Sequence, residues 1–324
     1  MEQHLTSHLN KVFSVKAHAR LHMGFFDLQG GPLCTFGSLG MTLNNPVTEI
    51  DASVAEKFAI NRNIDAKSSE NIAKITQRLQ KKLNLQGSLN LHVNSLIPQH
   101  IGLGSGTQLA LSLVSLFNQA YHLQLSQSQI AQLSGRGARS GIGLGAFEQG
   151  GFLVDVGKQN ELLPEIAFRH EFPKNWRVIL VCDKTHIGVH GAHELNAFNT
   201  LKPMHSNLKS LALERMAPAL QRGNLLEFGA YMDDLQAYNG AYFGPAQGGL
   251  YASQHVENAL NYLRQHGVAC VGQSSWGPTG FAIIESEAKA NIYLENLKKQ
   301  FADEMNLSFT ITQGFNQGAM IKAE

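Results

Sequence analysis

A glycine-rich segment between a predicted strand and a predicted apolar helix has the composition of an anion-binding turn. It reads Ile97-Pro-Gln-His-Ile-Gly-Leu-Gly-Ser-Gly-Thr-Gln-Leu-Ala-Leu111. Successive backbone N–H groups in such a turn, at the positive end of a helix, hold a phosphate or pyrophosphate. The segment is neither a Walker A loop nor a dinucleotide fingerprint, and a turn of this kind is also found as a plain packing feature. The residues that we expect to form the phosphate cradle are Gly102, Gly104, Ser105, Gly106 and Thr107.

Charged and titratable side chains lie in two further segments. Arg136 and Arg139 are three residues apart in a Gly/Ser-rich stretch, where two guanidinium groups would suit one anion, the alternative being exposed charges or helix-end partners. Arg20 and His22 alternate with Leu21 and therefore face one side of a strand. His22 has the ordinary pKa of a proton carrier, although a histidine on a strand is also often a simple hydrogen-bonding group.

Three histidines with helical spacing form a possible metal-binding cluster. His186, His190 and His193 would share one face of a helix, as a metal site requires. Gly188 and Gly191 make a continuous helix there doubtful. We therefore favour contacts with substrate, or with the groups that bind it, over a dedicated metal site.

Hydrophobic periodicity predicts strands and helices in alternation along the whole chain, so the fold class is α/β or α+β. The expected strands span residues 14–19, 89–93, 151–156, 176–182, 270–271, 281–284 and 307–312. The expected helices span residues 69–83, with a serine as N-cap, and 109–117, 127–133, 206–222, 225–238, 254–265 and 287–301. A polar stretch with Pro164 and Pro173 at its ends predicts a domain boundary, giving domains at 1–165 and 166–324.

Composition narrows the class of protein. The 324 residues carry a formal net charge of +1, which gives no support for a nucleic-acid surface. Three widely spaced cysteines fit a reducing compartment. The chain shows no signal-peptide pattern and no apolar run of the roughly 18 residues that span a bilayer. We expect a cytoplasmic protein that binds neither nucleic acid nor membrane.

The motifs resemble those of the GHMP kinase superfamily, which includes galactokinase and the homoserine and mevalonate kinases. Pro98–Ala110 is similar to its second motif, Gly272–Ala282 to its C-terminal glycine-rich motif, and Ala19–Gly24 stands at the position of its first. Five motifs in order resemble one branch, the β-ribofuranosylaminobenzene 5′-phosphate synthase family. They are Arg-Leu-His-x-Gly, Gly-Leu-Gly-Ser-Gly-Thr-Gln, Gly-Arg-Gly-x-Arg-Ser-Gly-Ile-Gly, Ala-Phe-Glu-x-Gly-Gly-Phe and Gly-Gln-Ser-Ser-Trp-Gly-Pro-Thr-Gly-Phe, and they span most of the chain.

The resemblance implies an α+β, GHMP-kinase-like two-domain fold, with an N-terminal α/β domain like that of a ribosomal protein and a ferredoxin-like C-terminal domain. Kinases of the superfamily often carry Ser-Gly-x-Asp after the second motif, with the aspartate as base. Here the stretch reads Ser140-Gly141-Ile142-Gly143, and a glycine cannot accept a proton. The chemistry implied is instead a decarboxylating phosphoribosyl transfer. Phosphoribosyl pyrophosphate would react with 4-aminobenzoate or 4-hydroxybenzoate to give a C-riboside, CO2 and pyrophosphate, a step of tetrahydromethanopterin biosynthesis.

The resemblance also suggests roles for residues outside the phosphate cradle. Arg20 would hold the benzoate carboxylate or a phosphate, His22 would move a proton, and Asp27 would bind Mg2+ or face the oxocarbenium charge, unless it simply forms a turn. Glu148 is a candidate ligand of Mg2+ or of a ribose hydroxyl, or a solvated carboxylate. The remaining candidates for substrate contact are Arg136, Arg139, Ser140, Gln273, Ser274, Ser275, Thr279 and Trp276, whose ring would stack on the aromatic substrate or belong to the core.

The expected ion is Mg2+ carried by pyrophosphate, with no organic cofactor, and the expected assembly is a homodimer. Two other functions remain open from the sequence. One is an ATP-dependent small-molecule kinase with a substituted base, and the other is a phosphosugar or nucleotide sensor without catalysis on the same fold.

Overall fold

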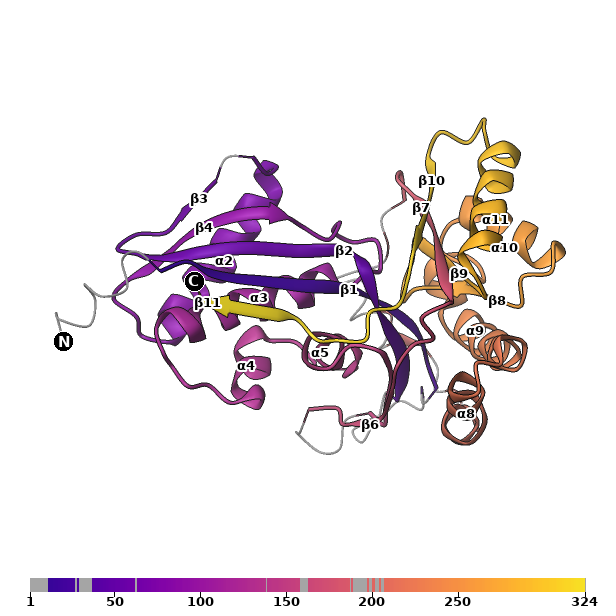
Figure 1. Ribbon diagram of the computed structural model, residues 1–324, viewed down its shortest axis with the longest axis horizontal. Helices are drawn as coiled ribbons and strands as arrows, with labels where there is room; N and C mark the ends of the chain where they lie inside the picture. Colours follow the sequence, from indigo (N-terminus) through magenta and orange to yellow (C-terminus); the bar gives the residue numbers. More distant parts are fainter. Residues whose placement is uncertain are drawn as a thin grey trace.

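A computed structural model describes residues 11–26, 28, 37–61, 63–137, 139–157, 163–186, 188, 197, 200–201, 204 and 207–323. Two β-sheets lie side by side along the long axis of the molecule, each with its own helices (Figure 1). No helix in the described part of the chain is long and apolar enough to cross a membrane.

Within the described ranges, the first sheet has seven strands and is built around a long antiparallel pair. β1 (Phe13–Phe25) pairs with β2 (Ser38–Ala55), and the sheet continues through β4 (Ser88–Ser95) to the parallel edge strand β3 (Ala59–Ile60). β5 (Phe152–Asp155) pairs with the first part of β2 and with β6 (Ile166–His170). The last strand, β11 (Met320–Ala323), returns from the far end of the chain to pair with the start of β1.

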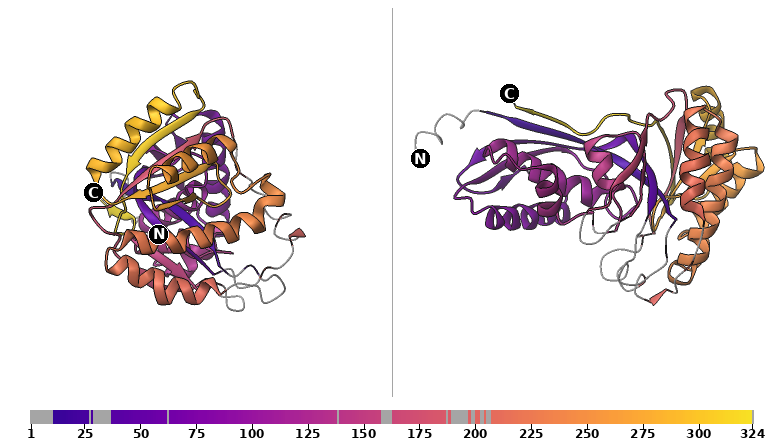
Figure 2. Two further views of the ribbon diagram at one scale, coloured as in Figure 1. Left: turned by 90° about the vertical axis from the view of Figure 1, so that its right-hand side faces the viewer. Right: turned by 90° about the horizontal axis from the view of Figure 1, so that it is seen from below.

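Four helices cover one face of this sheet, as the view from below shows (Figure 2). They are α2 (Ala66–Lys82), α3 (Ser105–Ala120), α4 (Gln127–Ser134) and α5 (Ile142–Glu148). α3 is almost entirely buried, because the run from Leu109 to Phe117 is apolar apart from the small side chains of Ser112 and Ser115. α2 is amphipathic, and its N-cap is Asp65, which accepts a hydrogen bond from the Ser68 amide at 2.9 Å. The predicted serine cap is therefore wrong, since Asp65, four residues before the predicted start of the helix, takes that position.

The second sheet has the ferredoxin-like order. Its four strands are β7 (Arg177–Asp183), β8 (Cys270–Gln273), β9 (Thr279–Ile284) and β10 (Leu307–Thr312), and they run antiparallel in the order β10-β7-β9-β8. With helices between β7 and β8 and between β9 and β10, this is the split βαβ arrangement. The first set of helices comprises α7 (Leu208–Leu211), η1 (Ala212–Met216), α8 (Ala217–Gln221), α9 (Leu225–Gln247) and α10 (Gln254–Gln265), and the second is α11 (Glu287–Gln300).

Alternation along β7 explains how this sheet buries both faces. Ile179 and Val181 pack with α10 and α11, whereas Val178 and Leu180 belong to a cluster that includes α9. That second cluster also contains Leu21 and Met23 of β1. One apolar core therefore joins the two sheets, and β1 carries Arg20 and His22 through the junction.

The observed strand pairing differs from the predicted domain boundary for two strands, β6 and β11. β6 begins after the predicted boundary at residue 165, yet it pairs with β5 in the first sheet, and β11 also belongs to that sheet. Residues 166–170 and the end of the chain therefore lie with the first sheet, although the sequence places them in the second domain. β6 crosses the predicted boundary because it pairs with its neighbour in sequence, β5, whereas the pairing of β11 with β1 joins distant segments and is invisible to local composition.

Candidate active site

A cavity of about 590 Å³ opens where the turn before α3 meets the loop between β8 and β9. Its volume lies within the range of small-molecule sites. α2 forms the outer wall with Lys67, Glu70, Asn71 and Lys74. The inner wall brings together nine residues predicted as site residues or standing beside them: Arg20, Gly102, Gly104, Ser105, Gly106, Thr107, Arg136, Ser275 and Trp276.

The turn before α3 has the backbone conformation that its glycines predict. Gly102 and Gly104 have φ of 88° and 81°, in the region that L side chains rarely adopt. A Cβ at Gly102 would collide with the carbonyl oxygen of Ser274. Gly104 is the N-cap of α3, so the positive end of a 16-residue helix faces the cavity.

Two arginines lie on either side of this turn. The Arg20 guanidinium donates from Nη1 to the Gly102 carbonyl oxygen at 2.6 Å and packs along Gly104. Arg136 Nη2 lies about 3.0 Å from the position that a Cβ on Gly106 would occupy. A helix N-terminus with two guanidinium groups beside it suits a multiply charged anion such as pyrophosphate.

The loop between β8 and β9 ties this cavity to β1. The Ser274 hydroxyl donates to the Gly102 carbonyl at 2.8 Å and accepts a hydrogen bond from the His22 amide at 3.1 Å. The Ser275 amide donates to the His22 carbonyl at 2.8 Å. Ser274 therefore acts as a brace between the phosphate turn and β1, while Ser275 lines the cavity.

His22 lies beyond Arg20 along β1, in a second and smaller cavity of about 20 Å³. Its imidazole is 3 % exposed, and neither ring nitrogen has a hydrogen-bond partner among the described residues. Burial, together with the charges of Arg20 and Arg139, lowers the pKa of His22 to about 3. The imidazole is therefore neutral at physiological pH, which does not suit the predicted role of proton carrier.

The other predicted residues of the loop have different positions. Gln273 is buried: its Oε1 accepts from the Ala252 amide at 2.6 Å and its Nε2 donates to the Ser275 carbonyl at 3.0 Å. Trp276 is 4 % exposed, packs on Phe243 with ring centroids 4.2 Å apart, and lines both cavities. Thr279 lines neither cavity, because its buried hydroxyl lies 3.5 Å from Cys182 Sγ inside the second sheet.

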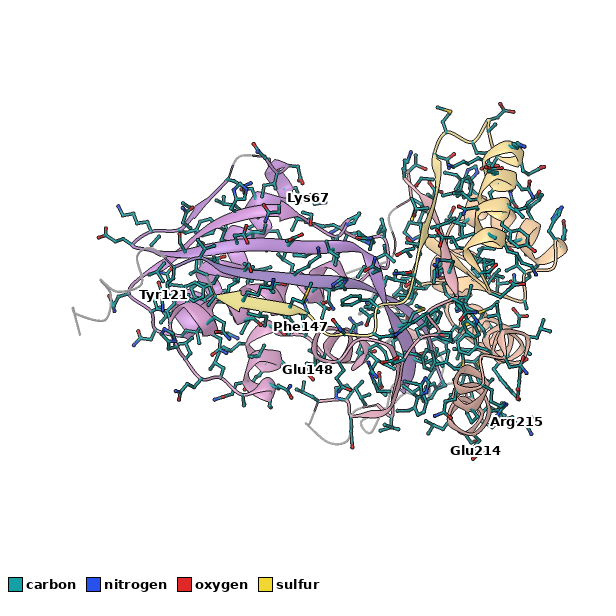
Figure 3. The ribbon with its side chains drawn as sticks, viewed as in Figure 1. Lys67, Tyr121, Phe147, Glu148, Glu214 and Arg215 are labelled. Carbon is teal, nitrogen blue, oxygen red and sulfur yellow. The ribbon has the colours of Figure 1, made fainter. Side chains whose placement is uncertain are left out.

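Three further predicted residues lie apart from the large cavity. Glu148 is an exposed residue at the end of α5 that does not line the large cavity, and Figure 3 labels it below the strands of the first sheet, whereas Lys67 of the cavity wall is labelled above them. Arg139 does not line the cavity with Arg136, although its charge acts on His22. We expected Arg136 and Arg139 to bind one anion, but only Arg136 lines the cavity. Asp27 lies outside the described residues.

Gly143 stands where the kinases carry their aspartate, and packing closes that position to a side chain. A Cβ on Gly143 would lie 2.9 Å from Thr107 Cγ2, and the Gly143 carbonyl accepts a hydrogen bond from Gln108 Nε2 at 2.9 Å. A catalytic aspartate would have to displace Thr107 of the phosphate turn. The structure thus gives a steric reason, besides the missing carboxylate, for chemistry other than kinase chemistry.

A buried carboxylate that the sequence did not single out holds the segment before α5. Asp155 accepts hydrogen bonds from the hydroxyls of Ser38 and Ser140, at 2.5 and 3.2 Å, and from the amides of Gly141 and Gly157, at 3.0 and 2.9 Å. Burial raises the pKa of Asp155 to about 6, against the opposing effect of these hydrogen bonds. Ser140, predicted to contact substrate, is instead part of this structural network. The only sequence signal for Asp155 was a carboxylate at the end of an apolar strand.

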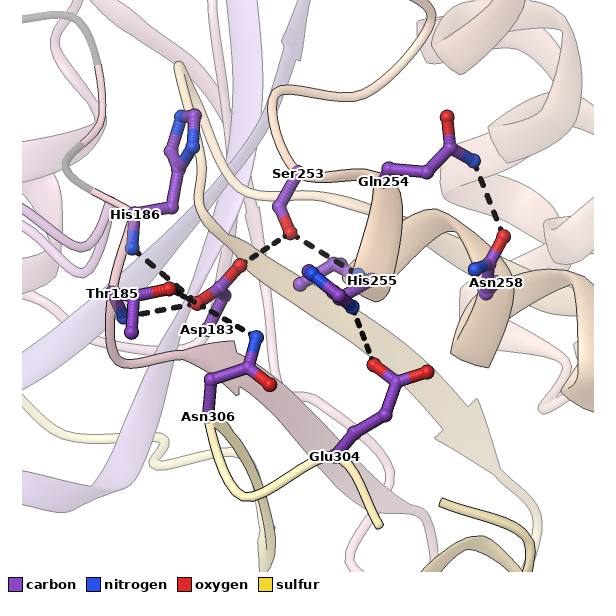
Figure 4. Close-up of polar contacts among 10 residues, drawn as sticks. Asp183, Thr185, His186, Ser253, Gln254, His255, Asn258, Glu304 and Asn306 are labelled. Atoms are coloured by element: carbon purple, nitrogen blue, oxygen red, sulfur yellow. Dashed lines mark hydrogen bonds and ion pairs between the residues drawn. The ribbon is translucent and has the colours of Figure 1, made fainter.

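A second carboxylate anchors the segment that follows β7 (Figure 4). Asp183 accepts hydrogen bonds from the hydroxyls of Ser253 and Thr185, each at 2.7 Å, and from the His186 amide at 3.3 Å. Five residues further on, the Gly188 amide donates to the His100 carbonyl at the cavity wall. His190 and His193 lie outside the described residues, and the described residues contain no group of three or more potential metal ligands of the His, Cys, Asp or Glu type.

Comparisons with known proteins agree with this geometry. The GHMP kinases N terminal domain family matches residues 70–151, and the GHMP kinases C terminal family matches residues 216–303. Mevalonate diphosphate decarboxylase from Staphylococcus aureus has the same fold, with a TM-score of 0.66 and 17% identity over 96% of this chain and 98% of its own. MDDEF, solved in complex with MVAPP, AMPPCP and magnesium, gives a TM-score of 0.66 with 15% identity over 97% of this chain and 99% of its own. The fold and the phosphate turn define a member of the GHMP kinase superfamily.

Sequence similarity to curated relatives narrows the assignment within that superfamily. Beta-ribofuranosylphenol 5'-phosphate synthase from Methanocaldococcus jannaschii is 32% identical over 83% of this chain and 88% of its own length. The enzyme of the same name from Archaeoglobus fulgidus is 30% identical over 95% of this chain and 99% of its own. The chain belongs to the β-ribofuranosylphenol 5′-phosphate synthase family, whose members are transferases.

Proposed function

We propose that the protein is a decarboxylating C-ribosyltransferase that joins phosphoribosyl pyrophosphate to a 4-substituted benzoate, an early step of tetrahydromethanopterin biosynthesis. The observation that carries the proposal is the near full-length similarity to synthases named for a ribofuranosylphenol phosphate product. The geometry adds two supports: a cavity built for a multiply charged anion, and a position for the kinase aspartate that is closed by Thr107.

In the proposed reaction, a C1′–C bond replaces the C1′–O bond of the sugar, and the same C1′–C bond then replaces the carboxylate on the ring. The C1′–O bond to pyrophosphate breaks and its electron pair leaves with pyrophosphate. The ring carbon that bears the carboxylate supplies the pair for the new C1′–C bond. Loss of CO2 returns the electrons of the C–carboxylate bond to the ring and restores its aromaticity.

The residues of the large cavity fit the leaving group. Arg20, Arg136 and the N-terminus of α3 would bind pyrophosphate and stabilise the charge that develops on it. Ser275, Trp276 and Gly277 form the side of this cavity that faces β1, and the indole of Trp276 would exclude water from that side of the cationic sugar carbon.

Mg2+ is part of the proposal as an ion that arrives with pyrophosphate. Hard oxygen donors line the cavity, and the hydroxyls of Ser105 and Thr107 with the Glu70 carboxylate would be its protein ligands. Bound there, Mg2+ would neutralise charge on the leaving group. Glu148 does not line the cavity and is no longer our candidate ligand.

We favour 4-hydroxybenzoate as the acceptor over 4-aminobenzoate, because a phenol product is what the relatives' names specify. The test measures 14CO2 from carboxyl-labelled 4-hydroxybenzoate and 4-aminobenzoate, each with phosphoribosyl pyrophosphate and Mg2+. We expect release that requires both substrates and is faster with the hydroxy acid. Substrate-stimulated ADP formation from ATP without CO2 would favour a kinase, and tight phosphosugar binding without any product would favour a sensor.

The proposed assembly is a homodimer, an expectation that comes from the family resemblance. Light scattering on the purified protein should give a mass close to twice 35.4 kDa. A mass of one chain at micromolar concentration would contradict it.

A further inference from the structure

The small cavity beside His22 contains a polar group that nothing in the described part of the chain satisfies. His22 is buried between the large cavity and α9, and its ring lies 4.4 Å from that of Phe25. Both ring nitrogens lack a hydrogen-bond partner among the described residues. A buried imidazole without partners costs free energy unless something outside the chain binds it.

Asn239 and Gln236, two other polar side chains around this cavity, are occupied by hydrogen bonds to the protein. Asn239 exchanges hydrogen bonds with the backbone of Phe25, at 2.9 and 2.8 Å. Gln236 donates to the Met23 carbonyl at 2.7 Å and accepts from the Gln273 amide at 2.8 Å. His22 therefore offers two ring nitrogens to a ligand, whereas the polar side-chain atoms of Gln236 and Asn239 are already engaged.

Size restricts what can enter. About 20 Å³ holds one water-sized group and excludes an aromatic ring. Ser275 and Trp276 line this cavity and also the large one, so the two spaces adjoin at that wall. A ligand in the large cavity could therefore place one terminal heavy atom against His22.

We propose that the small cavity receives the 4-substituent of the acceptor, with His22 as its hydrogen-bonding partner. This inference rests on the proposed function and extends it to substrate recognition. The carboxylate-bearing carbon must face C1′ of the sugar near Arg20 and the phosphate turn. The para substituent then points to the opposite end of the ring, and His22 is the next residue on the same face of β1.

A neutral imidazole suits this task. One ring nitrogen accepts a hydrogen bond from the hydroxyl or amino group, and the other can donate. The depressed pKa of His22 keeps it in that form across the physiological range. In this account His22 selects and orients the acceptor and carries no net proton.

The experiment compares two acceptors of similar size that differ in hydrogen bonding. Calorimetry gives the Kd of 4-hydroxybenzoate and of 4-fluorobenzoate for the wild-type protein, His22→Leu and His22→Asn, with inorganic pyrophosphate and Mg2+ present. We expect the wild type to prefer the hydroxy acid by about tenfold, the usual effect of one neutral hydrogen bond. In His22→Leu the preference should fall to within about twofold, and His22→Asn should keep an intermediate preference.

His18 provides the matched control on the same strand. It is equally buried, stacks on Phe315 and hydrogen-bonds through Nδ1 to the Asn44 carbonyl, and it does not line the small cavity. His18→Leu should keep the wild-type preference. An unchanged preference in both folded His22 variants, from a wild type that releases CO2, would overturn only this inference. A wild type that releases no CO2 from either benzoate would overturn the proposed function itself.

Discussion

At the scale of single residues, two buried groups near the site have pKa values shifted toward their neutral forms. Burial lowers the pKa of His22 to about 3 and raises the pKa of Asp155 to about 6. Both shifts link folding to pH, but with opposite signs. Substituting His22 and Asp155 one at a time separates their contributions to the pH dependence of the free energy of unfolding.

His22 should make the protein less stable as the pH falls. Between pH 6.5 and about 3 the unfolded chain binds a proton on this imidazole that the folded chain does not bind, so the free energy of unfolding decreases with falling pH. The expected slope from this group is about 1.4 kcal/mol per pH unit. Urea unfolding of the wild type and His22→Leu at several pH values between 7.5 and 4.5 checks it. A constant difference between the two proteins over this range would contradict the assignment.

Asp155→Asn should destabilise the protein by about 1–3 kcal/mol at pH 7, because it leaves buried groups without partners. Both carboxylate oxygens accept backbone N–H groups, from Gly141 and Gly157, so an amide in either orientation turns its NH2 toward a donor. In addition, the raised pKa of Asp155 stabilises the folded protein further as the pH falls through about 6, where the folded chain binds the proton first. The destabilisation by Asp155→Asn should therefore be larger at pH 5 than at pH 7.

Asp51→Asn is the control for that variant. Asp51 also accepts a side-chain hydrogen bond, from Asn94 Nδ2 at 2.8 Å, but at the surface of the first sheet. Its replacement should change the free energy of unfolding by about 0.5 kcal/mol or less. Equal effects of the two substitutions would show that the Asp155 network adds no stability beyond an exposed hydrogen bond.

At the scale of elements, the turn before α3 depends on close contact with the loop between β8 and β9. Gly102→Ala adds a Cβ that collides with the Ser274 carbonyl at a φ of 88°. We expect a loss of at least tenfold in affinity for inorganic pyrophosphate, measured by calorimetry, because the anion cradle has to move.

Gly223 gives a matched control for the backbone strain alone. Its φ is 66°, and a Cβ there would meet nothing within 4 Å. Gly223→Ala should cost about 1 kcal/mol of stability and leave pyrophosphate affinity unchanged. Similar pyrophosphate affinities for the two alanine variants would argue against the cradle.

The sequence predicted most elements whose hydrophobic period is clear. α10 and β10 have the predicted bounds, and β9 begins two residues before its predicted start. β2, eighteen residues long, was missed because Asn44, Asn45 and Pro46 interrupt it with residue types that are rare in strands. β11 was missed because it is exposed throughout and shows no alternation.

Site residues that follow from a local sequence pattern could be predicted. Site residues whose roles depend on contacts with distant segments could not. The phosphate turn and Arg20 follow from glycine spacing and strand alternation. The network of Asp155 with Ser38 joins residues 117 positions apart, and no local pattern reports such a contact. Thr279 was misassigned for a related reason, since its hydroxyl type suggested a ligand whereas β-sheet geometry turns it toward Cys182.

At the scale of the whole molecule, the apolar core that joins the two sheets should make unfolding cooperative. Trp176 and Trp276 both belong to that core, together with residues of β1, α9 and β9. Tryptophan fluorescence and far-ultraviolet circular dichroism should therefore report one coincident transition in urea. Two separate transitions would show that the sheets unfold independently and that the shared core contributes little.

The proposed reaction forms a new carbon–carbon bond at the ring carbon that loses its carboxylate. The most direct measurement uses 4-hydroxybenzoate enriched with 13C at that ring carbon and phosphoribosyl pyrophosphate enriched at C1′, followed by 13C NMR of the product. We expect a one-bond carbon–carbon coupling between the two labelled positions, with pyrophosphate and CO2 released in equal amounts. A product that retains the carboxylate, or that lacks the coupling because the sugar is attached through oxygen, would contradict it.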